Sequence, residues 1–161
     1  MNIELEKVRL PEFGVPEDIP VIPAHRYEER CLKAYQAADC DWLVAYGDRE
    51  HFANLHYLCG YDPRFEEALF ILGPDGKNYL LVGNEGIDYS DCVNIEVEVI
   101  LYQTFGLMGQ DRTLSSRLDT ILQGIGIRRS HRVGVCGWKY LDTDEKVAGS
   151  SGFFVPAVLV D

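Results

Sequence analysis

The chain has 161 residues, of which 47% are hydrophobic and 25% are charged, and its formal net charge is −11. A chain of this length buries roughly 70% of its unfolded surface when it folds as one domain, so length and composition predict a single globular domain. Nucleic acids and anionic membrane surfaces attract clustered Lys and Arg, and the acidic balance argues against both as partners.

The amino-terminal residues and the cysteines indicate the cellular compartment in which the protein resides. Charged residues interrupt Met1–Leu10, which argues against a signal peptide, and no stretch approaches the ~18 apolar residues that cross a bilayer. The five cysteines are widely spaced and include no C-x-x-C pair. This pattern favours free thiols in a reducing compartment over a disulfide framework or a zinc site. We therefore predict a cytoplasmic protein.

The first half of the chain begins with a lead-in at residues 1–23 that contains four prolines. Because proline cannot occupy a helix interior, we expect an extended arm over the surface of a domain formed by residues 24–161. A helix is predicted from Ala24, since apolar residues recur at helical spacing. Its apolar face consists of Tyr27, Cys31, Ala34, Tyr35 and Ala38.

A short apolar run at Asp41–Tyr46 follows and is typical of a strand covered on both faces. Asp48 is positioned to cap a short helix that runs to about Leu58, and Gly60 is expected to end it. Two further apolar runs, Ala68–Leu72 and Tyr79–Val82, flank a Pro-Asp-Gly turn. Such a pair predicts an antiparallel hairpin.

The second half of the chain continues the alternation of strands and helices. Ile95, Val97 and Val99 alternate with Glu residues, as in an edge strand with one solvated face. The longest amphipathic helix is expected over Leu114, Leu118, Ile121, Leu122 and Ile125, with Gly124 or Gly126 at its end. The remaining expected elements are a strand at Val133–Cys136, a capped helix from Asp142 or Thr143, and a last strand at Phe153–Val160 that Pro156 interrupts.

This order of elements predicts an α/β fold with a mixed parallel and antiparallel sheet and helices on both faces. The chain ends on an apolar segment without a polar tail. We expect such an ending where a longer polypeptide continues past a domain boundary, although a free-standing protein stays an alternative.

Few residues point to catalysis. The four histidines form no His-x-His or H-E-x-x-H pair, and His51 and His56 are five positions apart, so they diverge on a helix. Cys136 fits a buried strand cysteine better than a nucleophile, which needs a His partner and an electropositive setting. No glycine-rich nucleotide-binding motif is present. We predict neither catalytic residues nor a metal site in this chain.

The segment Asn54–Glu67 is the exception, because aromatic and charged residues alternate there around a proline. Aromatic side chains together with Arg are the usual composition of a binding hot spot. A second interpretation places the aromatic rings in the core and the charges at its rim. The sequence leaves both interpretations open.

Four segments carry a family resemblance. They read A-Y-G-D-R-E-H-F-A-N-L-H-Y-L-C-G at 45–60, L-L-V-G-N-E at 80–85, R-V-G-V at 132–135 and V-P-A-V-L-V-D at 155–161. In content, order and spacing the chain resembles the amino-terminal domain of the creatinase/prolidase/aminopeptidase P family of metallopeptidases. The resemblance covers roughly residues 24–161.

The resemblance implies a creatinase/prolidase amino-terminal-like fold and the non-catalytic part of an enzyme such as an Xaa-Pro dipeptidase or aminopeptidase P. The family holds a divalent dimetal centre (Mn, Co or Zn) in a carboxy-terminal catalytic domain, which this chain lacks. The implied partners are that catalytic domain in the same polypeptide, a second copy in a homodimer, and a short peptide substrate. By position in the motif, His56, Tyr61 and Arg64 are implied to face the substrate of the chain's own or a neighbouring active site.

A second hypothesis belongs to a different class. The chain is then a free-standing α/β binding or assembly module without peptidase activity. Whether the natural polypeptide extends past Asp161 discriminates between the two hypotheses.

Overall fold

The computed structural model describes residues 5–14, 20–137, 139, 144 and 154–160. A five-stranded sheet in the order β4-β3-β2-β1-β5 forms its centre. The pairs β1–β2 and β2–β3 are antiparallel, whereas β1–β5 and β3–β4 are parallel. The strands are β1 (Trp42–Gly47), β2 (Ala68–Leu72), β3 (Asn78–Val82), β4 (Glu98–Leu101) and β5 (Val133–Cys136). The predicted mixed sheet is confirmed, and so is the hairpin of β2 and β3.

The central strands are buried on both faces, as their uninterrupted apolar runs predict. Successive side chains of β1 alternate between two cores: Leu43 and Ala45 enter one, while Trp42 and Val44 enter the other. The sheet therefore has no solvated face at its centre and needs a covering layer on each side.

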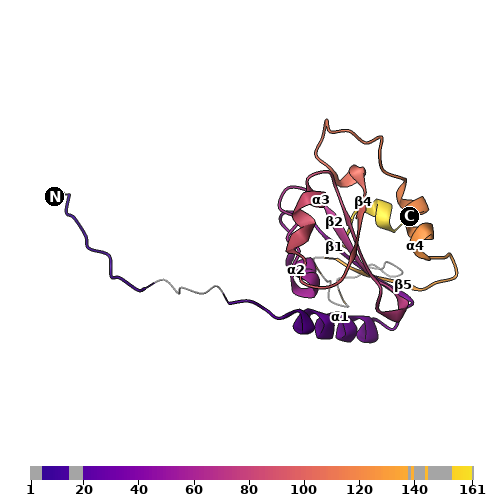
Figure 1. The fold of residues 1–161 in the computed structure, drawn as a ribbon, viewed down its shortest axis with the longest axis horizontal. Coiled ribbons are helices and arrows are strands. Elements are labelled where there is room, and N and C mark those ends of the chain that lie inside the picture. The colour runs from indigo at the N-terminus through magenta and orange to yellow at the C-terminus, as the bar shows by residue number, and fades with distance from the viewer. Residues whose placement is uncertain (1–4, 15–19, 138, 140–143, 145–153, 161) are drawn as a thin grey trace.

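One covering layer contains α1 (Ala24–Ala38) and α2 (Ala53–Cys59), which pack against each other and against β1 (Figure 1). Tyr27 and Cys31 are the buried residues of α1 and lie on its predicted apolar face. The short helix α3 (Gly86–Tyr89) contributes Ile87 to the same core. The expected helix from Ala24 is thus confirmed.

The other layer contains α4 (Leu118–Ile125), which packs Ile121 against the core that includes Trp42 and Tyr102. Helices therefore cover both faces of the sheet, as expected. Gly126 ends α4 with a φ of 110°, and its N–H donates to the carbonyl oxygens of Leu122 and Gln123. The helix is shorter than predicted, because Leu114 lies outside it and is 75% exposed; the longest helix is α1.

Two other sequence-based expectations are wrong in detail. Asp48 does not cap α2; its carboxylate accepts hydrogen bonds from the backbone N–H groups of Glu50 (2.9 Å) and His51 (2.8 Å). These hydrogen bonds stabilise the turn that precedes the helix. Phe52 occupies the N-cap position and makes no side-chain hydrogen bond there. Of the expected edge strand, only Glu98–Leu101 pairs with β3, while Ile95 and Val97 pack on the core before it.

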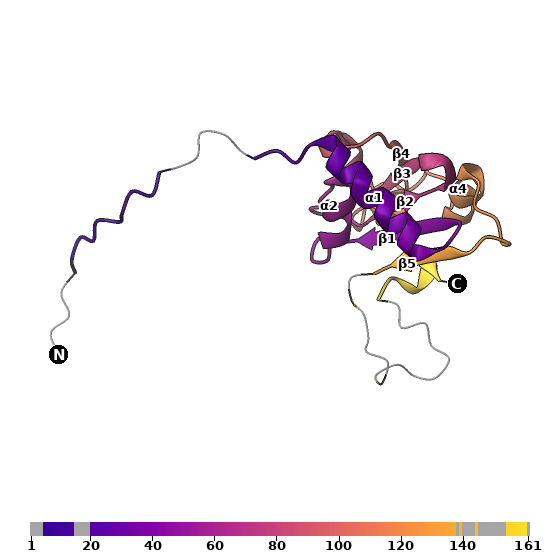
Figure 2. The ribbon, with the colours of Figure 1, turned by 90° about the horizontal axis from the view of Figure 1, so that it is seen from below.

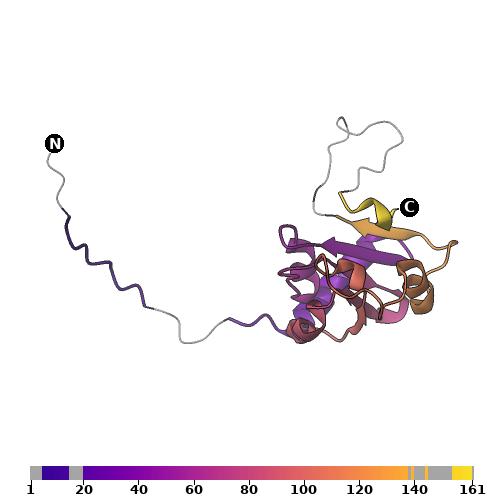
Figure 3. The same ribbon diagram turned by 90° about the horizontal axis from the view of Figure 1, so that it is seen from above.

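The expected last strand is also wrong, because Ala157–Leu159 forms a turn of 3₁₀ helix. Pro156 has a φ of −55°, which suits the start of a helical turn, and its carbonyl oxygen accepts from the N–H of Leu159. Figures 2 and 3 show this turn beside β5. The helix expected from Asp142 or Thr143 lies outside the described residues.

The described part of the lead-in is extended and exposed, but it does not lie over the domain surface as expected. Residues 5–14 lead away from the domain, and the chain joins it at the start of α1 (Figures 1 and 2). Among the described residues, no helix is long and apolar enough to cross a membrane.

Candidate functional site

The candidate site begins where α2 ends and the chain reverses direction. Gly60 adopts a φ of 83° and donates its N–H to the carbonyl oxygen of His56. A side chain here would be strained in the left-handed region, and its Cβ would also collide with the Asn94 amide. Gly60 thus releases the segment 61–67 from the helix and directs it along the end of the sheet.

Glu66 anchors this segment to a distant part of the chain. Its side chain is 5% exposed, and its two carboxylate oxygens accept from the N–H of Glu85 (3.1 Å) and of Gly86 (3.0 Å). Both donors belong to the turn that starts α3. Burying a carboxylate costs free energy unless hydrogen bonds compensate it, and these two bonds do so while they fix the loop.

Glycines make this close approach sterically feasible. A Cβ at Gly83 would collide with the Glu66 carboxylate, and one at Gly86 would lie 2.8 Å from the Tyr61 hydroxyl. Gly83 belongs to the L-L-V-G-N-E segment at 80–85. The 80–85 segment, which carries part of the family resemblance, therefore meets the loop that follows the 45–60 segment.

A pocket of 290 Å³ lies between the loop and α3. Tyr61 forms its buried wall, and its ring packs at a tilt against Tyr89, with 5.7 Å between the centroids. Burial raises the pKa of Tyr61 above its usual value, so its hydroxyl stays protonated at neutral pH. The lining residues are Tyr61, Pro63, Arg64, Phe65, Glu66, Glu85, Gly86 and Tyr89.

Arg64 provides the cation of the pocket. Its backbone has a φ of 46°, and its side chain is 61% exposed beside the Asp62 carboxylate, with 3.5 Å between Nε and Oδ2. The Tyr89 hydroxyl and the Asp62 carboxylate raise its pKa further above the usual value. Phe65 is 67% exposed next to it. An exposed guanidinium flanked by aromatic rings can bind a carboxylate and stack on a planar or apolar group.

No protein-family model matches the chain, and no curated protein matches it either.

The structure brings together two of the three residues implied to face a substrate. Tyr61 and Arg64 line the pocket, whereas His56 lies on the exposed side of α2 and is not among the lining residues. The His56 ring packs edge-on against Phe52, with 6.2 Å between centroids. Tyr61 is part of the core, as the second interpretation of the loop expects, whereas Phe65 is exposed.

Sequence reasoning missed three residues of this site, namely Glu66 in its anchoring role, Glu85 and Tyr89. Glu66 is one of many Glu residues and has no motif around it, and Tyr89 is 28 positions from Tyr61 in the sequence. The only available signal was the pair of glycines at 83 and 86, since a glycine often marks a place where another group approaches the backbone closely.

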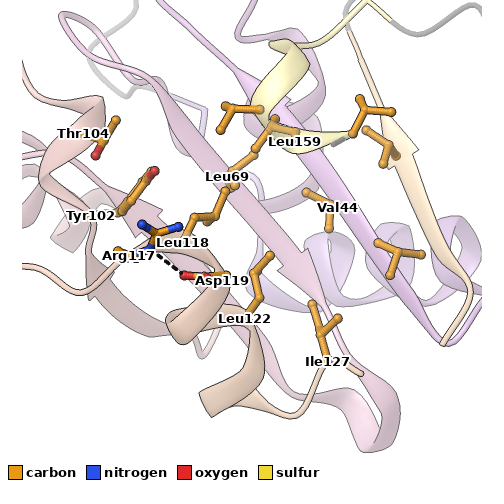
Figure 4. Close-up of a pocket in the computed structure, with 14 residues that line it drawn as sticks. Val44, Leu69, Tyr102, Thr104, Arg117, Leu118, Asp119, Leu122, Ile127 and Leu159 are labelled. Atoms are coloured by element: carbon orange, nitrogen blue, oxygen red, sulfur yellow. Dashed lines mark hydrogen bonds and ion pairs between the residues drawn. The ribbon is translucent and has the colours of Figure 1, made fainter. Parts of the chain in front are cut away.

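A second and larger cavity of 710 Å³ lies on the α4 side of the sheet (Figure 4). Side chains of β1, β2, β5, α4 and the last 3₁₀ turn make its wall mostly apolar, including Val44, Leu69 and Leu159. Polar atoms gather at one side, where Arg117 pairs with Asp119 at 3.3 Å. This composition can hold an apolar group.

Within the described part of the chain, no three His, Cys, Asp or Glu residues are grouped so that they could hold a metal ion. The five cysteines are free thiols. Cys136 is half-buried in β5 beside Ala45 of β1, and burial raises its pKa. His131 accepts the Trp42 indole N–H at its Nδ1 atom (3.1 Å) and the Arg128 backbone N–H at the same atom (3.2 Å). That ring nitrogen therefore has a structural role.

Proposed function

We propose that the chain is the non-catalytic amino-terminal domain of a cytoplasmic Xaa-Pro dipeptidase or aminopeptidase P-like metallopeptidase. In this role it dimerises and forms part of the wall of the substrate site, beside a catalytic carboxy-terminal domain of the same polypeptide. The mixed α/β sheet agrees with this role. So does the contact between the loop that follows the 45–60 segment and the 80–85 segment, since both segments carry the resemblance.

The single observation that carries the proposal is the anchored loop with Arg64 on it. Glu66 fixes the loop by two hydrogen bonds to backbone N–H groups, so Arg64 and Phe65 are held at the rim of the pocket. Every linear peptide with a free carboxyl terminus offers a carboxylate there, and a guanidinium can pair with a carboxylate through two parallel hydrogen bonds. Arg64 would therefore orient a short peptide, and the aromatic rings would exclude water from it.

The chemistry of bond cleavage lies elsewhere in this proposal. A dimetal centre in the catalytic domain supplies a polarised carbonyl and an activated water. The described residues of this chain hold no ligand set that fits such a centre. Their contribution is to bind and position the substrate.

The test replaces Arg64 by Ala in the full-length polypeptide. We expect kcat/KM for short peptides to fall about ten- to hundredfold, because a hydrogen-bonded charge pair contributes about 1.5–3 kcal/mol. The metal content, measured by mass spectrometry, should stay unchanged. The matched control is Arg49→Ala, since Arg49 is also an exposed Arg beside a carboxylate, 3.7 Å from Glu50, but does not line the pocket. Equal kinetics for both variants would remove the loop from the substrate site.

The 710 Å³ apolar cavity favours the second candidate function, a free-standing binding or assembly module. The two candidates differ in the size of the natural polypeptide. An immunoblot of source-cell lysate with antibody against this chain should show a band at more than twice 18.2 kDa if the chain is one domain of a peptidase. A band at the mass of the chain itself would favour the module.

A further inference from the structure

The amino-terminal arm, which we define as residues 5–14, carries apolar side chains that the domain does not cover. Leu5, Val8, Leu10 and Phe13 are 106%, 76%, 85% and 90% exposed. Single exposed apolar residues are ordinary, but several of them on one extended segment mark an interaction surface. An extended segment with spaced apolar side chains is also the form in which peptides fill grooves on other proteins.

The 710 Å³ cavity matches this segment in chemistry. Its wall is apolar, and its rim carries the exposed ion pair of Arg117 and Asp119. The side chains in this pair are 86% and 58% exposed, so both charges are free to exchange partners at little cost. The arm presents the complementary charges on Arg9 and Glu12, next to Leu10 and Phe13.

Geometry disfavours insertion of the arm into the cavity of its own chain. The arm joins α1 at its start, where Glu28 lines a depression together with Tyr79 of β3 and Glu98 of β4. The cavity lies on the opposite face of the sheet, beside Val133 and Val135 of β5 at the other edge. Five strands spaced ~4.8 Å apart are roughly 20 Å wide, and residues 15–23 span at most about 30 Å. A path around the sheet would therefore take up at least about two thirds of the reach of this linker.

We propose that the arm of one copy inserts Leu10 and Phe13 into the apolar cavity of a second copy. The two copies of the chain would exchange arms in a closed dimer. Arm exchange would form the interface of the dimer in the proposed function, and it rests only on the dimerisation in that proposal.

The first experiment measures the dimer dissociation constant of the 161-residue chain by sedimentation equilibrium. The double substitution Leu10→Asp and Phe13→Asp should raise this constant at least tenfold, because two carboxylates would enter an apolar cavity. Both positions lie in the exposed arm, so the domain should fold unchanged. The control is Leu32→Asp, which alters a 57% exposed residue of α1 outside the arm and the cavity.

The second experiment distinguishes exchange between copies from insertion within one chain. Chains with Leu10→Cys are mixed with chains carrying Val158→Cys, a 58% exposed residue of the cavity wall, and a short bis-maleimide links thiols that lie close together. We expect a linked species of twice the chain mass that neither variant nor the unaltered chain forms alone.

The outcomes separate the inference from the proposed function. An unchanged dissociation constant in the arm variant would overturn arm exchange and leave dimerisation in place. Linking within a single chain that carries both cysteines, without linking between chains, would also overturn it. A monomer at all concentrations of the unaltered chain would overturn both arm exchange and dimerisation through this domain.

Discussion

At the scale of single residues, the buried carboxylate of Glu66 has the largest consequence for the site. Glu66 is only 5% exposed to solvent, and each of its carboxylate oxygens accepts a hydrogen bond from one backbone N–H group. Hydrogen bonds to charged groups are among the stronger ones in proteins. The same residue therefore stabilises the fold and keeps Arg64 at the rim of the pocket.

We predict that Glu66→Gln lowers the free energy of unfolding by about 1–3 kcal/mol, as measured by urea denaturation. A Gln amide has only one acceptor oxygen, so one of the two N–H groups would face the NH₂ group instead. Glu50→Gln is the control, since that side chain is 77% exposed, and it should change stability by less than about 0.5 kcal/mol. Equal stability of the two variants would contradict the anchoring role of Glu66.

At the scale of elements, local sequence accounts well for the strands and for the ends of helices. The runs at 42–47, 68–72 and 79–82 are apolar and occupy the sheet interior. Gly60 and Gly126 end α2 and α4 in the left-handed region. At two misplaced elements the local signals conflict. The last segment is apolar like a strand, but Pro156 begins a helical turn there, and Asp48 resembles a helix cap but closes the turn before α2.

The two glycines of α4 give an element-scale prediction with an internal control. Gly126→Ala should destabilise the protein by about 1–2 kcal/mol, because its φ of 110° is unfavourable for any residue with a Cβ. Its Cβ would meet Trp42 only at an ordinary contact distance of 3.5 Å, so the cost is conformational. Gly124 lies inside the helix with open space around it.

Gly124→Ala should therefore stabilise α4 by about 0.5–1 kcal/mol. Thermal melting of both variants at neutral pH measures the two effects. A Gly126→Ala variant as stable as the unaltered protein would show that the end of α4 does not depend on the left-handed conformation of Gly126.

At the scale of the whole molecule, the two cores bury ionisable groups in their neutral forms. Burial raises the pKa of Cys31 to about 11 and that of Cys59 to about 12. Burial also raises the pKa of Tyr46, and the Tyr46 hydroxyl donates to the Glu67 carboxylate at 2.7 Å. These groups ionise more readily in the unfolded chain than in the folded protein.

The linkage predicts a loss of stability at alkaline pH. Above pH ~9 the unfolded chain releases thiol protons that the folded protein retains, so the free energy of unfolding falls as pH rises. The contribution of the two thiols to the free energy of unfolding is fully present below pH ~8.5. At pH 10 the free energy of unfolding should be lower by about 1 kcal/mol for each of Cys31 and Cys59. Urea denaturation at pH 8 and at pH 10 measures this difference. A free energy of unfolding that stays constant over this interval would show that the two thiols are not protected.

Local sequence is sufficient to predict the strands of the sheet interior, the β2–β3 hairpin, helix α1 and the glycine helix ends. Burial on both faces, turn chemistry and left-handed caps are all encoded by residues close together in the chain. It also singled out the Asn54–Glu67 segment as a candidate binding loop, and the family resemblance implied Tyr61 and Arg64 within it, together with His56.

The distant groups that complete that loop are known only from the folded structure. The hydrogen bonds from the N–H groups of Glu85 and Gly86 to Glu66, and the packing of Tyr89 on Tyr61, join segments about 20 to 30 positions apart. Such contacts depend on strand order and register, which arise from the packing of the whole sheet. For the same reason, the sequence could not show that the arm leads away from the domain or that an apolar cavity opens beneath α4.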